Sequence, residues 1–203
     1  DLRKLIIPLV IEQLLAVTIG MADTVMVSSC GEAAVSGISL VDSINFLLIT
    51  LFSSLATGGA VIASQYLGHR DREKACEASS QLMVVTAVCA LVFTVLSLVA
   101  RKPLLSLLFG RIDADVMDAA LTYLTVSAIS FPFLASFNSS SALFRAMNDS
   151  RTPTMVSLGM NVMNLVGNSI LIFGMKWGVA GAAIATIAAQ AVSGILCLIY
   201  IRF

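Results

Sequence analysis

Residues 6–27 constrain this chain most, because they are long and apolar enough to cross a bilayer and yet contain Pro8, Glu12 and Asp23. A helix of about twenty apolar residues spans roughly 30 Å, the thickness of the hydrocarbon core. An ionised carboxylate at its centre costs on the order of 3 kcal/mol, so such groups usually face a partner or a water-filled cavity. Glu12 and Asp23 are eleven residues apart, which places both on one helix face. We expect that face to point inward.

Composition extends this interpretation to the whole chain. The sequence is 58% hydrophobic and 12% charged, whereas about a quarter of the residues of a soluble domain are charged. Its 203 residues leave room for about six spanning helices, which predicts a single bundle over residues 1–203. The net charge of zero leaves no basic field for nucleic acid. We therefore expect a multi-pass protein of the cytoplasmic (inner) membrane, with membrane lipid as its partner.

The apolar segments predict an all-α integral membrane protein with six transmembrane helices. These are expected at approximately residues 5–27, 34–66, 78–100, 119–143, 154–174 and 179–201, with a short interfacial segment at 104–110. The charged segments 68–77, 111–118 and 144–153 are expected to be aqueous loops. Pro132 predicts a bend in the fourth helix.

Two further features of these segments carry expectations. Proline at position 103 is expected to help end the third helix after Arg101 and Lys102. The small residues near the end of the second helix are expected to let helices pack closely, rather than to bind a ligand: Gly58, Gly59, Ala60 and Ala63.

The basic residues predict that both termini face the cytoplasm. With the N-terminus inside, eight basic residues lie on the cytoplasmic side, against four outside. The inner set is Arg3, Lys4, Arg70, Arg72, Lys74, Arg145, Arg151 and Arg202, and the outer set is Arg101, Lys102, Arg111 and Lys176. The pair Arg101 and Lys102 runs against the trend.

Catalytic chemistry is not expected. His69 is the only histidine, and Cys30, Cys76, Cys89 and Cys197 show no CxxC spacing, so neither a metal cluster nor a thiol redox centre is predicted. No Gly-rich phosphate loop precedes a helix. The sequence therefore indicates neither an enzyme nor a bound cofactor.

The fifth predicted helix carries a single polar stripe. Its members recur at intervals of three and four residues: Thr154, Ser157, Asn161, Asn164 and Asn168. A stripe of this kind faces protein or water rather than lipid. One interpretation is hydrogen bonding that holds neighbouring helices together, and the other is a binding surface. Asn138, Asn161 and Ser157 are candidates for lining a substrate cleft.

Depth in the membrane groups some of these residues. In the N-in arrangement Asp23, Asn168 and Thr186 fall within roughly 5 Å of one depth at 1.5 Å per residue, and Asn164 lies one turn from Asn168. One carboxylate, two amide oxygens and a hydroxyl are ligands that a small hard cation prefers, and the carboxylate is equally able to hold a proton. We therefore expect a Na+ or H+ site here. The spacing does not establish lateral contact.

Two other carboxylates remain open. Glu12 and Asp42 are possible second protonation sites. The alternatives are a neutral, hydrogen-bonded Glu12 near the inner end of its helix and an interfacial Asp42 near the outer loop.

Five segments, taken in order, resemble the N-terminal half of a multidrug and toxic compound extrusion (MATE) transporter. They are MADTVMVSSCGEAAVSGISL (21–40), GGAVIASQYLG (58–68), FRAMNDSRTP (144–153), MNVMNLVGNSILIFG (160–174) and GVAGAAIAT (178–186). The resemblance covers essentially the whole chain. It implies one six-helix lobe of a two-lobed, twelve-helix protein that exchanges Na+ or H+ for cationic drugs by alternating access.

The resemblance also implies roles for particular residues. Asp23 matches the carboxylate that binds the cation or proton in the N-lobe, and Asn164, Asn168 and Thr186 match residues that complete a cation site in some members. Pro8 matches a proline that acts as a hinge in the first helix. Sodium-binding relatives can have aspartate at the position of Asn168, so its absence weakens the case for Na+ over H+.

The expected partners are therefore a small cationic organic substrate and the missing C-terminal lobe of the same polypeptide. A natural half-transporter that dimerises is the alternative to an incomplete chain. Two other functions stay open. A lipid-linked saccharide flippase of the same superfamily would need basic residues inside its helices, which the sequence lacks. A non-transporting membrane assembly subunit would need no carboxylates in the membrane.

Overall fold

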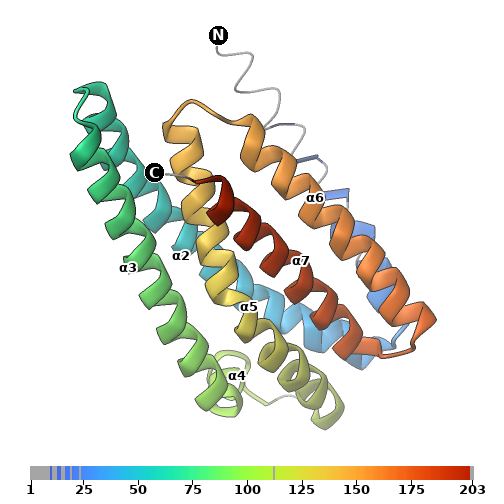
Figure 1. Ribbon diagram of the computed structural model, residues 1–203. Helices are drawn as coiled ribbons and strands as arrows, with labels where there is room; N and C mark the ends of the chain where they lie inside the picture. The colour runs from blue at the N-terminus through green and yellow to red at the C-terminus, as the bar shows by residue number, and fades with distance from the viewer. Residues whose placement is uncertain are drawn as a thin grey trace.

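The computed structural model describes residues 10, 13–14, 17–18, 20–22, 24–111 and 113–201. The described residues between 10 and 28 are helical. The helices that follow are α2 (Glu32–Gly68), α3 (Arg72–Val99), α4 (Arg101–Phe109), α5 (Ala114–Ala146), α6 (Arg151–Asn168) with its extension η1 (Ser169–Gly174), and α7 (Gly178–Tyr200). Figure 1 shows the long helices lying side by side, with the short α4 at one end of the bundle.

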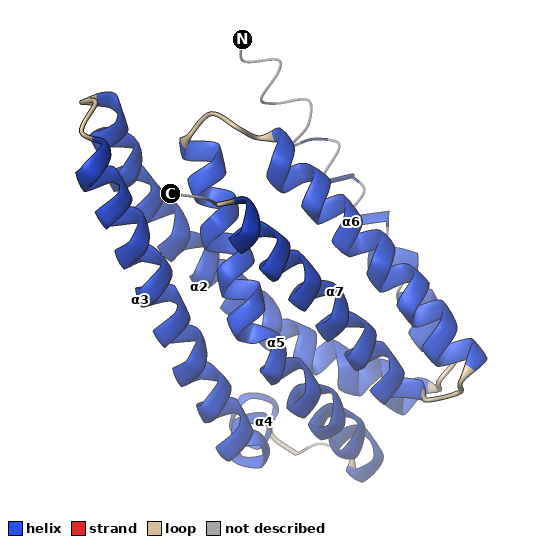
Figure 2. Ribbon diagram, in the orientation of Figure 1, coloured by secondary structure: helices blue, strands red, loops and turns tan. Residues whose placement is uncertain are grey.

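The described part of the chain contains helices and short loops but no strand (Figure 2). Five of its helices are long and apolar enough to cross a membrane: Glu32–Gly68, Arg72–Val99, Ala114–Ala146, Arg151–Gly174 and Gly178–Tyr200. The prediction of an all-α, multi-pass integral membrane protein is confirmed.

Helix α5 is the centre of the bundle, because α2, α3 and α7 all pack against it. Glycines allow two of these contacts. A Cβ added at Gly37 of α2 would lie 2.8 Å from the backbone nitrogen of Ala120, and one added at Gly194 of α7 would lie 2.8 Å from the carbonyl oxygen of Phe133. Helices in a membrane associate through such close packing, since lipid gives them no hydrophobic drive to pair.

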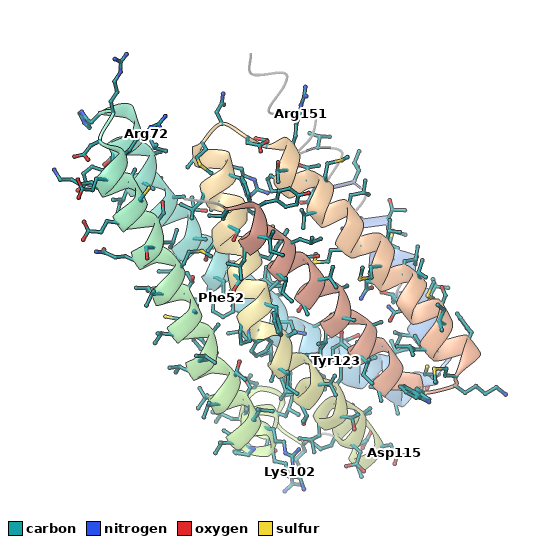
Figure 3. The ribbon with its side chains drawn as sticks, viewed as in Figure 1. Phe52, Arg72, Lys102, Asp115, Tyr123 and Arg151 are labelled. Atoms are coloured by element: carbon teal, nitrogen blue, oxygen red, sulfur yellow. The ribbon has the colours of Figure 1, made fainter. Side chains whose placement is uncertain are left out.

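Charged side chains gather at the two ends of the bundle. Figure 3 places Arg72 and Arg151 at one end and Lys102 and Asp115 at the other, with Phe52 and Tyr123 between them. Phe52 is fully buried and makes an edge-to-face contact with Phe93 of α3, with ring centroids 6.1 Å apart. This distribution is the one expected of helices that begin and end in water and cross an apolar layer.

The predicted loops are too long. Only residues 69–71 separate α2 from α3, so the charged segment expected to be a loop over 68–77 is mostly helix. Asp71 stabilises this early start, because its carboxylate accepts a hydrogen bond from the backbone nitrogen of Lys74 (3.2 Å) and pairs with the Lys74 ammonium group (3.2 Å). The same hydrogen bond lowers the pKa of Asp71. Charge marks contact with water, but it does not end a helix.

The same error affects the other two loops. Asp115 and Asp118 lie in the first turns of α5, where acidic residues complement the helix dipole. The loop expected over 144–153 is reduced to residues 147–150, and its Asn148 has a positive φ of 66°. Pro103 does not help to end α3, which stops at Val99. It lies in the first turn of α4, where proline is tolerated.

Helix α5 continues through Pro132 without interruption. Its ribbon changes direction along its length in Figure 1, as expected for a helix that contains proline. Among the small residues at the end of α2, Gly59 faces Leu82 and the side chains of Ala60 and Ala63 are buried beside it. Gly58 is different: a Cβ there would meet nothing within 4 Å, so its expected packing role is wrong within this structure.

Candidate cation site

The candidate site lies beside two close contacts between α7 and the α6–η1 pair. A Cβ added at Gly167 of α6 would lie 2.9 Å from the Cβ of Ala185, and one added at Gly181 of α7 would lie 3.1 Å from the Cβ of Leu171. Both glycines therefore permit helix contact that a larger side chain would prevent. Polar side chains next to these contacts are brought close to the opposite helix.

Three of the predicted residues meet there. The amide of Asn164 donates to the hydroxyl of Thr186 (3.0 Å), and the amide of Asn168 donates to the carbonyl oxygen of Asn164 (3.2 Å). Thr186 in turn donates to the backbone carbonyl of Ala182 (3.0 Å). Asn168 is 0% exposed. The lateral contact that spacing alone did not establish is therefore present for these three side chains.

The chemistry of this cluster is that of neutral oxygen donors. An amide oxygen has two lone pairs and a hydroxyl oxygen also has two, so Asn164 and Thr186 each retain acceptor capacity beyond the bonds described. Within the described residues no group of three or more His, Cys, Asp or Glu side chains is placed to hold a metal. A carboxylate would add the negative charge that these neutral donors lack.

Three predicted residues of the first segment, Pro8, Glu12 and Asp23, lie outside the described residues. Met26, three positions after Asp23, is described and has a contact with α6–η1. The hydroxyl of Ser169 lies 3.9 Å from the sulfur of Met26 in hydrogen-bonding geometry, and Ser169 directly follows Asn168. The end of the first segment therefore borders the candidate site.

The residues predicted for a substrate cleft are dispersed. Ser157 is buried, Asn161 is half-buried, and the amide of Asn138 on α5 donates to the carbonyl of Leu134 in its own helix (3.0 Å). None of the described hydrogen bonds joins these three to Asn164, Asn168 or Thr186. Asp42 lies on an exposed part of α2. Thr154, the first member of the stripe, donates to the backbone carbonyl of Ser150 (2.8 Å).

Two features of this region were missed. Gln190 lies one turn beyond Thr186 on α7, and its side-chain oxygen is buried with no hydrogen-bond partner among the described residues. Its spacing of four from Thr186 was a usable signal. The second is η1, a π-helical turn that directly follows Asn168. Nothing in the sequence of residues 169–174 indicates it, although π-turns occur often beside functional sites.

These observations define the class: a multi-pass α-helical membrane protein with a hydrogen-bonded, partly buried polar cluster between two of its spanning helices. The chain belongs to the MatE family, whose sequence model matches residues 8–170. The chain is 33% identical over 203 residues to an uncharacterized transporter, YisQ, of Bacillus subtilis. The alignment covers 96% of this chain and 43% of that protein. The chain is 28% identical over 213 residues to the probable multidrug resistance protein NorM of Thermotoga maritima. That alignment covers 100% of this chain and 44% of NorM.

The fold is also similar to solved structures. A MOP superfamily transporter from Pyrococcus furiosus matches with a TM-score of 0.90 and 21% identity, over 97% of this chain and 43% of the other. The family resemblance drawn from the five segments is confirmed. The chain spans less than half the length of the curated relatives it matches, as a half of a two-lobed transporter would.

Proposed function

We propose that this chain forms one lobe of a cation-coupled antiporter that exports cationic organic compounds across the cytoplasmic membrane. The observation that carries the proposal is the hydrogen-bonded group of Asn164, Asn168 and Thr186 between two spanning helices, with Asn168 buried and the other two half-buried. The multidrug resistance names of several relatives support the class of cargo. Both termini lie on the cytoplasmic side in this proposal, and the second lobe is supplied by the same polypeptide.

Asp23 supplies the negative charge in the proposed site. The contact between Ser169 and Met26 supports this assignment, because it joins the segment that contains Asp23 to the residue after Asn168. Asn164 and Thr186 then offer oxygen atoms to a Na+ ion, or hydrogen bonds that set the proton affinity of the carboxylate. Since the described donors are all neutral, a proton needs fewer of them than Na+ does, and H+ is the favoured coupling ion.

Coupling follows if the ion and the cargo favour different states. Binding of a proton or Na+ at Asp23 from outside promotes the conformation that releases the cationic cargo, and loss of the ion to the cytoplasm resets the lobe. An ion that bound both conformations with equal affinity would not shift the equilibrium between them. Asn168 is itself buried, and an unpaired charge on Asp23 beside it would be costly without an ion or a cationic cargo.

The test is ethidium efflux driven by an imposed pH or Na+ gradient in proteoliposomes that contain the transporter at its full natural length. Asp23→Asn should abolish efflux while the protein is still produced. Thr186→Val should weaken the apparent affinity for the coupling ion about tenfold, which corresponds to about 1.4 kcal/mol. Thr122→Val is the matched control, because the exposed hydroxyl of Thr122 donates to the carbonyl of Asp118 in its own helix (2.9 Å) and to no other described residue.

Each result has a clear meaning. Normal efflux by Asp23→Asn would refute the proposed site. An equal effect of Thr186→Val and Thr122→Val would remove the α6–α7 cluster from the mechanism. Efflux that follows the pH gradient in Na+-free buffer would establish H+ as the coupling ion.

A further inference from the structure

A groove lies between α6 and α7, displaced from the candidate cation site toward the beginning of α6 and the end of α7. Its volume is about 370 Å3. It is lined on α6 by Thr152, Met155, Val156, Gly159, Met160 and Met163, and on α7 by Val192, Ser193, Leu196 and Tyr200. The two helices touch through Gly167 and Gly181 nearer the other end, so the groove forms where they separate.

The groove faces outward from the lobe. Asn161 of the polar stripe is two residues from both Gly159 and Met163, which is about 200° round the helix. The polar stripe and the groove therefore occupy opposite faces of α6. Met155 is 70% exposed and Tyr200 is 63% exposed, so the groove is open along its length. An apolar helix face that is exposed on a membrane-spanning lobe is suited to contact with lipid.

The walls of the groove offer little to a polar ligand. The hydroxyl of Thr152 already donates to the carboxylate of Asp149 (2.6 Å), and the hydroxyl of Ser193 donates to the carbonyl of Ala189 (2.8 Å). The remaining lining is aliphatic or methionine, apart from Tyr200 at the end of α7. Methionine is flexible and adapts its shape to an apolar guest. The chemistry of the walls suits a hydrocarbon chain.

The length of the groove matches one leaflet. On α6 its lining runs from Thr152, the second residue of the helix, to Met163, eleven residues later. At 1.5 Å per residue this is about 16 Å, or half of a hydrocarbon core of about 30 Å. The groove therefore extends from the membrane surface to the midplane, as an acyl chain does.

The Thr152 end of the groove carries one cation and one carboxylate, because Arg151 immediately precedes Thr152 and Asp149 accepts the hydrogen bond of the Thr152 hydroxyl. Arg151 is the first residue of α6, immediately before Thr152, and its side chain is exposed. Figure 3 shows it at the end of α6, pointing away from the bundle. A guanidinium group binds phosphate through paired hydrogen bonds. Tyr200, at the opposite lip, is an aromatic residue of the type enriched at the membrane interface.

We propose that the α6–α7 groove is a binding site for a phospholipid, which places one acyl chain along the methionine-lined wall and its phosphate at Arg151. The lipid belongs to the leaflet on the Arg151 side, which is the inner leaflet in the N-in arrangement. It fills the space between the two helices that carry the cation site. The inference does not depend on the transported cargo or on the coupling ion.

The test uses the transporter at its full natural length in nanodiscs that contain phosphatidylglycerol with a photoreactive diazirine in its acyl chain. After irradiation, mass spectrometry measures labelling of residues 151–163 and 192–200. The reference is the exposed apolar face of α3, which includes Val84, Val88, Leu91 and Val95. Labelling of the groove should exceed that of the α3 face several-fold, and added inorganic phosphate should not reduce it.

Gly159→Leu is the decisive variant. A Cβ at Gly159 meets nothing within 4 Å, so the new side chain fills the groove without displacing the backbone. Labelling of the groove should fall several-fold, whereas labelling of α3 should not change. Gly58→Leu is the matched control, because its Cβ also meets nothing within 4 Å and Gly58 lies on α2. Arg151→Gln should remove the preference for phosphatidylglycerol over phosphatidylcholine.

Three outcomes would overturn the proposal. Labelling of the groove no stronger than that of the α3 face would show ordinary lipid contact. Unchanged labelling in Gly159→Leu would place the lipid elsewhere. Displacement of the label by ethidium would assign the groove to the cargo instead of a lipid.

Discussion

Substitution of Gly37 by alanine tests whether close backbone approach between α2 and α5 holds the bundle together. The added Cβ would lie 2.8 Å from the nitrogen of Ala120, 2.9 Å from the Cβ of Ala119 and 2.9 Å from the carbonyl oxygen of Val116. Two of these three atoms belong to the backbone of α5, so no side-chain rotation relieves the clash. The helices have to separate.

The expected cost follows from that geometry. Non-bonded heavy atoms prefer separations of about 3.5–4.0 Å, so α2 has to move by roughly 0.7 Å or more at this point. Overpacking of this kind costs about 1–3 kcal/mol. Alanine also gains up to about 1 kcal/mol over glycine in helix propensity, which partly offsets the cost. Gly58→Ala in the same helix has the same gain and no clash, because its Cβ meets nothing within 4 Å.

The measurement is the free energy of unfolding in mixed micelles, obtained by titration with a denaturing detergent. The propensity term is common to both variants, so the difference between Gly37→Ala and Gly58→Ala isolates the steric cost. We expect Gly37→Ala to be the less stable by about 1–3 kcal/mol. The double variant Gly37→Ala with Ala119→Gly should recover only part of the loss, since the backbone contacts remain. Equal stability of the two alanine variants would refute the reasoning.

Two further predictions concern buried and capping hydrogen bonds. Thr86→Val removes the acceptor of the Ser139 hydroxyl (2.8 Å) between α3 and α5, and should cost only about 0.6 kcal/mol in a double-mutant cycle with Ser139→Ala, because Ser139 also bonds to the carbonyl of Ala135. Asp149 accepts from the first backbone N–H groups of α6, and the Thr152 hydroxyl bound to it lowers the pKa of this carboxyl below its ordinary 3.8. Asp149→Ala should therefore cost about 1 kcal/mol at neutral pH. Stability from a lowered pKa is present above 3.8 and lost as the pH falls through the folded value, so the difference between the two proteins in thermal unfolding should disappear only in strong acid. A constant difference across the whole pH range would contradict this assignment.

The fold class was predictable because the membrane imposes a simple requirement on sequence. Each spanning helix needs about twenty apolar residues, and hydropathy reveals them without knowledge of their neighbours. The second to sixth predicted spans correspond to α2, α3, α5, the α6–η1 pair and α7. The boundaries were less accurate. Residues 72–77, charged and therefore assigned to a loop, are helical because Asp71 caps α3 and the helix continues into water.

The sequence predicted which residues of α6 and α7 belong to the candidate site, but it did not predict the contacts between them. Periodicity on one helix placed Asn164 and Asn168 on a common face, and the inferred depth placed Thr186 at their level in the membrane without bringing it into contact. Gln190 was missed, because a single glutamine in a small-residue helix suggested no stripe, although its spacing of four from Thr186 fits one. The roles of Pro8, Glu12 and Asp23 remain predictions, since these residues lie outside the described part of the chain.

The sequence alone determined what each helix presents to its surroundings, since burial in lipid or protein is a property of composition and of a period of 3.6 residues. Only the tertiary structure decided which faces meet. It placed α5 at the centre, brought Asn164 to within 3.0 Å of Thr186, and opened the groove between α6 and α7. The physical reason is that contact between helices depends on backbone approach at a few positions. Gly37, Gly167 and Gly194 permit that approach, and Gly58, the same residue type, faces open space.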